Sequence, residues 1–215
     1  MSDQDCLVYV IDDDPLVQQS LADLIASANL PAQTFGSTAE FMRRQRPDVP
    51  ACLILDVELP GLSGLDFQLE LKKSGIEIPI IFITGHGDIP MSVRAMKSGA
   101  LEFLTKPFRG PELIDAVSKA LVRDREFRKQ RSASLELQNR LATLTPRERQ
   151  VLTLVVAGLL NKQIAGELRI TELTIKVHRG RVMRKMQAES LADLVRMAEK
   201  LKITPALAGH STKVE

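Results

Sequence analysis

Residues 51–61, ACLILDVELPG, decide the fold. The apolar run 51–55 is unbroken and ends at Asp56. A short continuous apolar run predicts a strand that is buried on both faces, which is typical of a parallel sheet covered by helices on either side. Ligands of such sheets bind beyond the carboxyl ends of the strands, so Asp56 stands where a ligand would lie.

Four further apolar runs continue this pattern through the first half of the chain. We predict strands at residues 7–11, 31–35, 80–84 and 102–104, and helices at 15–28, 37–46, 64–73, 89–98 and 111–122. Strands that alternate with helices predict an α/β fold in which a five-stranded parallel sheet is doubly wound.

The second half of the chain has an all-helical (all-α) pattern. Residues 123–141 are polar and lack Gly and Pro, which predicts an exposed linker helix that is too polar for a long coiled coil. This helix either stands alone or continues the helix at 111–122. From Leu144 onward we predict four helices. The first is capped by Thr145, with Glu148 three residues after the cap as in a capping box, and it ends at Gly158. The others occupy 161–168, 171–186 and 190–201. This order is that of a helix-turn-helix.

Charge separates the two halves. Residues 1–122 carry 10 Lys and Arg against 17 Asp and Glu, a net charge of −7, whereas residues 123–215 carry 19 against 10, a net charge of +9. We therefore predict a first domain at 1–122, a helical linker at 123–143, a second domain at 144–208 and a flexible tail at 209–215. The basic half is a candidate for binding a polyanion.

Composition narrows the class of protein. A hydrophobic fraction of 44% and a charged fraction of 26% are ordinary for a globular protein. No apolar run is long enough to span a bilayer and no signal peptide is recognisable, so we expect a cytoplasmic protein without a membrane partner. The only cysteines, Cys6 and Cys52, lie in apolar stretches and predict buried thiols rather than a zinc site or a disulfide.

Polar side chains gather at the carboxyl ends of the predicted strands. They are three acids after the first strand, one acid after the third, a hydroxyl at the end of the fourth and an ammonium after the fifth: Asp12, Asp13, Asp14, Asp56, Thr84 and Lys106. Carboxylates packed this closely repel one another unless a cation lies among them, and such oxygen ligands suit Mg²⁺. Asp14, just before Pro15, fits a helix cap better than a metal ligand.

This set resembles that of a response-regulator receiver. The match rests on Asp12-Asp13, Asp56 in LDVELPG, Thr84 in FITGH and Lys106-Pro107, in order over residues 6–122. The resemblance implies a flavodoxin- and CheY-like receiver in which Asp56 takes a phosphoryl group from a sensor histidine kinase and slowly loses it again. It also implies Mg²⁺, with Mn²⁺ as an alternative, held by Asp12, Asp13, Asp56 and the main-chain carbonyl of Glu58, and a cis peptide before Pro107.

The same resemblance implies how phosphorylation is transmitted. Thr84 and Lys106 would contact the phosphoryl group, and Phe103 matches the aromatic residue that moves inward with Thr84 on phosphorylation. Phosphorylation would either release the DNA-binding half from the receiver, to which its opposite charge could hold it, or let two receivers pair as a homodimer. The helix at 190–201 is a candidate contact between two DNA-binding domains.

The helix at 171–186 has an apolar back, which includes Ile175 and Val182, and a basic front. LTPRE (144–148), NKQIA (161–165) and TIKVH (174–178) resemble the LuxR-type helix-turn-helix domain. The whole chain thus resembles the NarL/FixJ family, and TGHGDIPM (84–91) resembles its FixJ branch. The resemblance implies a transcription regulator rather than an enzyme, with promoter DNA and RNA polymerase as partners. It also implies these DNA contacts: Asn161, Lys162, Lys176, Val177, Arg179, Arg181 and Arg184.

This helix departs from many LuxR-type domains at Gly180 and Arg181, where a non-glycine residue and Asn are common. Glycine weakens a helix, but it would let the DNA approach the backbone closely.

Alternatives to these interpretations stay open. A Mg²⁺-dependent phosphatase with an aspartyl nucleophile would use a second acid two residues after it, as in Asp56-Val57-Glu58, although the Asp12-Asp13 pair and the lack of a substrate-capping insertion argue against it. A switch whose output is protein binding would show no salt-dependent DNA binding. Phe103 would otherwise be a core residue, and each single Arg a solvated surface charge.

Overall fold

The structure, a computed structural model, describes residues 6–203. The chain divides into two compact units, Met1–Lys129 and Gln130–Glu215, which we call the N-terminal and C-terminal units. The predicted limits at 122, 143 and 144 remain predictions. The predicted flexible tail at 209–215 and the predicted domain end at 208 lie outside the described residues. Within residues 6–203, no helix combines the length and the apolar character needed to cross a membrane.

A five-stranded sheet forms the middle layer of the N-terminal unit. All neighbouring strands are parallel, in the order β2-β1-β3-β4-β5. The strands are β1 (Leu7–Ile11), β2 (Ala32–Phe35), β3 (Ala51–Asp56), β4 (Ile80–Thr84) and β5 (Glu102–Thr105). This is the flavodoxin-like strand order, and it confirms the predicted fold class.

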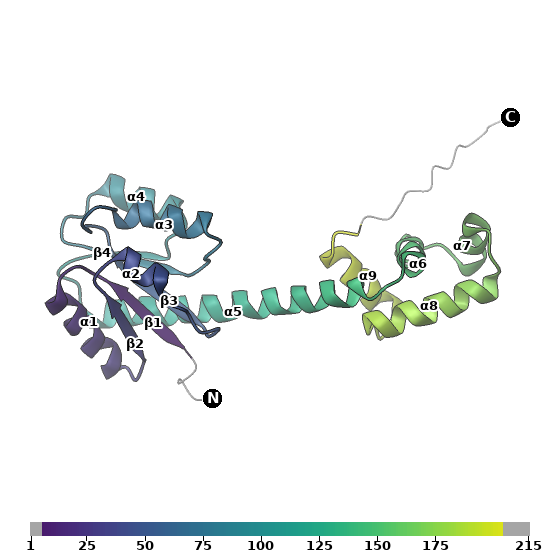
Figure 1. The fold of residues 1–215 in the computed structure, drawn as a ribbon, viewed down its shortest axis with the longest axis horizontal. Coiled ribbons are helices and arrows are strands. Elements are labelled where there is room, and N and C mark those ends of the chain that lie inside the picture. Colours follow the sequence, from purple (N-terminus) through teal and green to yellow (C-terminus); the bar gives the residue numbers. More distant parts are fainter. Residues whose placement is uncertain (1–5, 204–215) are drawn as a thin grey trace. The chain divides into compact units, whose positions relative to one another are not determined.

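Helices cover both faces of the sheet, as the buried strands require (Figure 1). One face packs against α1 (Pro15–Ser27) and the first part of α5 (Gly110–Ala142). The other face packs against α2 (Thr38–Arg43), α3 (Gly64–Lys73) and α4 (Ile89–Lys97). All residues of β1, β3 and β4 are buried, which explains why their sequences show no apolar–polar alternation.

One helix is shorter than predicted, and another takes the longer of two forms that the sequence allowed. Helix α2 ends at Arg43 rather than Arg46, and Arg44 is already extended. Pro47 contributes to this early end, because the residue before a proline is disfavoured in helical conformation. Helix α5 joins the predicted helices 111–122 and 123–141 into one element of 33 residues. No glycine or proline interrupts residues 123–141, and the absence of breakers allows the helix to continue.

As far as residue 203, the C-terminal unit is all-helical, as predicted. Beyond the end of α5 it contains α6 (Pro146–Val156), α7 (Asn161–Leu168), α8 (Glu172–Met186) and α9 (Leu191–Lys200). Thr145 and Glu148 form the predicted capping box at the start of α6. The apolar back of α8, which includes Ile175 and Val182, packs into one core with α6, α7 and α9.

Candidate functional site

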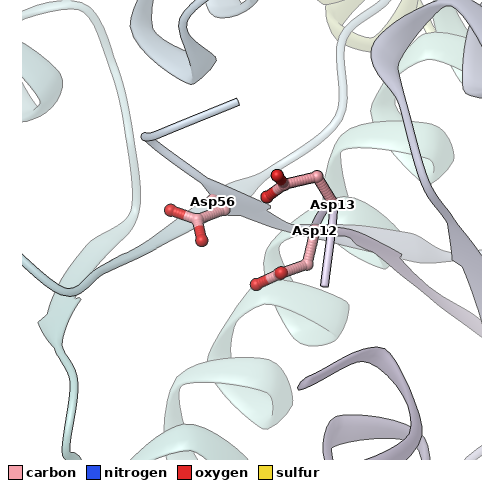
Figure 2. A group of neighbouring side chains, drawn as sticks. All are labelled: Asp12, Asp13 and Asp56. Atoms are coloured by element: carbon pink, nitrogen blue, oxygen red, sulfur yellow. The ribbon is translucent and has the colours of Figure 1, made fainter. Parts of the chain in front are cut away.

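Three carboxylates meet at the carboxyl edge of the sheet. Asp12 and Asp13 follow β1, and Asp56 is the last residue of β3 (Figure 2). One oxygen of each carboxylate lies within 4.8 Å of an oxygen of the other two. Asp12 and Asp56 are buried, whereas Asp13 is exposed, so the cluster opens to solvent on one side. The structure therefore brings together the predicted carboxylate ligands.

Lys106, directly after β5, reaches into this cluster. Its Nζ donates to Asp56 Oδ2 at 2.7 Å and to Asp12 Oδ2 at 2.8 Å. Burial alone would lower the pKa of Lys106, but the hydrogen bonds to Asp12 and Asp56 outweigh it, so the pKa is raised. Burial raises the pKa of the Asp12 carboxyl, against the lowering effect of Lys106. The ammonium thus carries much of the charge compensation that two neighbouring buried carboxylates need.

The backbone around Asp56 is fixed by two close contacts. The N–H of Glu58 donates to Asp56 Oδ1 at 3.0 Å, so each oxygen of this carboxylate accepts one hydrogen bond. Gly64, at the start of α3, packs directly on the main chain of Asp56. A Cβ at Gly64 would lie 2.3 Å from the carbonyl oxygen of Asp56, so only glycine fits there.

The Glu58 side chain forms a contact that the sequence did not predict. Its Oε1 lies 3.2 Å from His86 Nδ1 and accepts a long hydrogen bond, 3.5 Å, from the hydroxyl of Thr84. For a receiver, only the main-chain carbonyl of Glu58 had been expected at the site. The acid two residues after Asp56 and the histidine two residues after Thr84 were the available signals, but the contact depends on how two loops pack.

Phe103 and Thr84 lie next to the same glycine. Phe103 is half-buried on β5 and packs against Phe82, with 6.3 Å between ring centroids. A Cβ at Gly87 would come 3.0 Å from Phe103 Cε1 and 3.2 Å from Thr84 Cγ2. The loop after β4 therefore packs tightly against both predicted switch residues. Two other expectations are confirmed: Asp14 caps α1, and the peptide before Pro107 is cis.

In the C-terminal unit, the predicted DNA contacts belong to α7 and α8. Most of them are exposed: Lys162, Lys176, Val177, Arg181 and Arg184. The remaining two, Asn161 and Arg179, lie together, because Arg179 Nη1 donates to Asn161 Oδ1 at 3.2 Å. The start of α7 and the middle of α8 thus form one polar and basic surface, which suits the phosphates of a nucleic acid.

A buried ion pair fixes the other end of α8. Glu148 is 2% exposed, and one of its oxygens accepts from Lys185 Nζ at 2.7 Å. The hydrogen bond from Lys185, with a further one from the main chain of Thr145, lowers the pKa of the Glu148 carboxyl. Lys185 also donates to the carbonyl of Thr143, and Arg140 donates to that of Met186. The C-terminal turn of α8 is therefore tied to the end of α5 and to the start of α6.

Together, the doubly wound sheet, the acidic pocket with its lysine and the basic helix-turn-helix define a response regulator with a DNA-binding output. Comparison with known families agrees. Residues 8–118 match the response regulator receiver domain, and residues 142–198 match the bacterial regulatory proteins of the luxR family. The chain belongs to the LuxR-type response regulators and is FixJ-like within them.

Individual relatives extend over nearly the whole chain. Nodulation protein W of Bradyrhizobium diazoefficiens is 52% identical over 209 residues, which cover 97% of this chain and 91% of that protein. The solved structure of the response regulator StyR aligns with a TM-score of 0.84 at 47% identity, covering 91% of this chain and 99% of that one. Full-length FixJ from B. japonicum aligns with a TM-score of 0.56 at 38% identity, covering 93% and 98%.

Membership of this family establishes the general function. The protein is a transcriptional regulator whose receiver implies a sensor kinase as partner, and whose luxR-type domain implies DNA binding.

Proposed function

We propose that Asp56 accepts a phosphoryl group from a phosphohistidine of the sensor kinase. An oxygen of Asp56 attacks the phosphorus as the P–N bond breaks, which leaves an acyl phosphate on Asp56 and returns the histidine to the kinase. The contacts of Lys106 carry this proposal most directly. The ammonium that lies 2.7 Å from the nucleophile before transfer is within reach of a phosphoryl oxygen afterwards. Slow hydrolysis of the acyl phosphate resets the protein.

Three residues would then respond to the phosphoryl group. Lys106 exchanges its contact with Asp56 for one with a phosphoryl oxygen. Thr84 exchanges its long hydrogen bond to Glu58 for a stronger one to the phosphate, since hydrogen bonds to charged oxygens are shorter and stronger. Phe103 follows, because Gly87 packs against Phe103 and Thr84 alike. The result is a shift between two populations of the receiver.

The donor set fits a hard divalent cation. Asp12, Asp13, Asp56 and the main-chain carbonyl of Glu58 would hold Mg²⁺, or Mn²⁺ in its place, since carboxylate and carbonyl oxygens are the ligands these ions prefer. When bound, the metal neutralises charge on the phosphoryl oxygens during transfer. The exposed Asp13 keeps the cluster open to solvent, and this leaves a route for the ion and the phosphoryl donor.

The output of the switch is promoter binding as a homodimer. Phosphorylation favours pairing, α9 supplies a contact between two DNA-binding domains, and RNA polymerase is the further partner at the promoter. We place the protein in the bacterial cytoplasm because its partner is chromosomal DNA. The receiver extends over residues 1–122, the linker over 123–143 and the DNA-binding domain over 144–208.

The DNA contacts divide into two groups. Lys176 and Val177 reach base edges or the floor of the major groove, with Arg184 further along the same front of α8. Asn161, Lys162, Arg179 and Arg181 hold phosphates. Replacing the exposed Lys162 by Ala should weaken binding to all sequences alike and lower the slope of log affinity against log salt by about 1.

Phosphorylation tests the proposal directly. The full chain is incubated with a small-molecule phosphodonor and Mg²⁺, and is followed by intact mass and by size-exclusion chromatography. Wild type should gain the mass of one phosphoryl group and increase in apparent size. The Asp56→Asn variant should show neither change.

Asp23→Asn is the matched control, because Asp23 is an exposed acid on α1 and should be dispensable. Asp23→Asn should behave as wild type. Unchanged mass in wild type, or phosphorylation that survives Asp56→Asn, would contradict the assignment of Asp56. Steady release of phosphate from a small phosphate ester would instead favour a phosphatase.

A further inference from the structure

Helix α8 exposes two large apolar side chains on its basic front. Leu173 is 73% exposed and Val177 is 47% exposed. They are four residues apart and thus lie on the same face of the helix, which continues through Gly180 and Arg184. Single exposed apolar residues are ordinary on protein surfaces, but here two adjoin on the face that carries the predicted DNA contacts.

Gly180 lies on this same face, in the interior of α8. Nothing in the fold of the chain requires a glycine at this position. Its φ is not in the left-handed region. A Cβ at this position would meet no heavy atom within 4 Å outside the neighbouring helix backbone, so neither conformation nor packing requires a glycine. Glycine is among the poorest helix formers. The space above Gly180 is therefore available to something that is not part of this chain.

The charged residues around this face of α8 indicate which kind of ligand binds there. Helix α8 carries five Lys and Arg residues against a single acid, Glu172. Lys176 and Arg181 flank the strip of Leu173, Val177 and Gly180, and both are exposed. A surface that is apolar along its middle and cationic along its edges matches the major groove of duplex DNA, where base edges lie between two rows of phosphates.

The groups that base pairs present in the major groove limit what the apolar strip of Leu173, Val177 and Gly180 can contact. Of the groups that base pairs present in the major groove, the methyl group of thymine is the apolar one. In a helix-turn-helix, the N-terminal residues of the second helix contact the base edges, and Leu173 lies in the first turn of α8. We infer that Leu173, together with Val177, reads thymine methyl groups, and that Gly180 lets the duplex approach α8 closely enough for this contact. Leu173 is thus a specificity-determining residue of the DNA-binding domain.

This inference rests on the proposed DNA-binding surface, so the experiment separates the two. The phosphorylated full chain selects its preferred sequences from a pool of random duplexes. In the best sequence, each thymine is replaced singly by uracil, which lacks only the methyl group, and affinities are measured at one salt concentration. Wild type should lose about fourfold for each methyl that it contacts, the value expected for burying one methyl-sized group.

Substitutions assign the effect to the residue. For the uracil duplex that lacks the methyl group contacted by Leu173, the Leu173→Ala variant should bind as tightly as it binds the thymine duplex. The Leu173→Met variant should still bind the thymine duplex more tightly than that uracil duplex. Leu135→Ala makes the same change at an exposed leucine of α5 and should behave as wild type. Gly180→Ala should raise the thermal stability and weaken DNA binding, an opposite pair of effects that a purely structural glycine would not give.

Each of the following outcomes would contradict one particular claim. If no sequence is enriched and binding does not depend on salt, the proposed DNA-binding function fails. If a sequence is enriched but wild type binds thymine and uracil duplexes alike, the function stands and the inference is wrong. If Leu173→Ala lowers transcription while the thymine preference persists, Leu173 contacts a protein rather than DNA. If Gly180→Ala binds DNA as tightly as wild type, the inference that Gly180 lets the duplex approach α8 closely is wrong.

Discussion

Asp124 should anchor α5 to the receiver sheet, and its replacement by Ala should destabilise the N-terminal unit. Asp124 is 1% exposed although it lies in a polar helix. Its Oδ2 accepts from the main-chain N–H of Ala51, at the start of β3, at 2.8 Å and from Arg128 Nε at 2.6 Å. Arg128 in turn pairs with Asp48, before the same strand.

The magnitude follows from these contacts. A hydrogen bond to a charged group contributes about 1.5–3 kcal/mol to stability, and the buried N–H of Ala51 would lose its acceptor. The higher helix propensity of Ala offsets about 0.5 kcal/mol. The free energy of unfolding should therefore fall by about 1–2.5 kcal/mol, a substantial share of the stability of a small domain.

The chain contains its own reporter for this measurement. It has one tyrosine and no tryptophan, and Tyr9 is buried in the receiver core. Tyrosine fluorescence during urea unfolding of the full chain therefore reports on the N-terminal unit. Asp124→Asn keeps an oxygen for the N–H of Ala51 and should give a smaller loss.

Asp115→Ala removes an exposed acid from the same helix and should unfold close to wild type. Equal unfolding free energies for Asp124→Ala and Asp115→Ala would refute the anchoring role of Asp124.

Three further predictions concern buried ionisable groups. Lys106→Met leaves Asp12 and Asp56 without their ammonium partner. With a chelator present, this variant should have a free energy of unfolding about 3 kcal/mol lower than wild type. Added Mg²⁺ should raise the free energy of unfolding of Lys106→Met by more than it raises that of wild type. The hydrogen bond from Lys185 lowers the pKa of the Glu148 carboxyl from 4.5. The stability that this carboxylate contributes is therefore present above pH 4.5 and is lost as the pH falls through the lowered pKa. Glu148→Gln should remove this pH dependence, which hydrogen exchange in α6 would measure. Burial raises the pKa of the Cys52 thiol, so alkylation, followed by mass, should require unfolding of the N-terminal unit.

Each of these has a contrary result. Equal effects of Mg²⁺ on wild type and Lys106→Met would mean that the lysine does not neutralise the carboxylates. Persistent acid lability of α6 in Glu148→Gln would assign it to another group. Alkylation of Cys52 under native conditions, with Tyr9 fluorescence unchanged, would show that β3 opens locally.

The acidic pocket could be predicted because it depends on connectivity alone. Once 7–11, 51–55, 80–84 and 102–104 are taken as parallel strands, the residues at and just beyond the carboxyl end of each strand must lie at the same edge of the sheet. No side-chain packing enters this inference. The helix boundaries at Thr145 and Asp14 were predictable for a similar reason, since a cap acts within one turn of its own helix.

Contacts between segments far apart in the sequence were not predictable. Asp124 looks like one more charge in a solvated helix, and its partner is a main-chain N–H 73 residues earlier. Glu148 was assigned to its cap, but its pairing with Lys185 requires knowing that α8 ends beside α6. The linker helix at 123–141 was judged too polar for a long coiled coil. The same helical stripe begins earlier in α5 with Leu113, Val117, Ala120 and Asp124. In the structure these residues are the buried face of α5, which packs on the sheet.

The two ends of α8 are under different constraints. Its C-terminal turn is tied to the main chain at Thr143 and to the buried Glu148, so changes there disturb the fold. Its exposed front makes few contacts within the chain, and substitutions at such positions usually change stability by less than about 0.5 kcal/mol. Descendants of this protein can therefore acquire new target sequences by mutating Leu173, Val177 or Gly180 without first acquiring compensating mutations, and regulators with the same scaffold can diverge to control different genes.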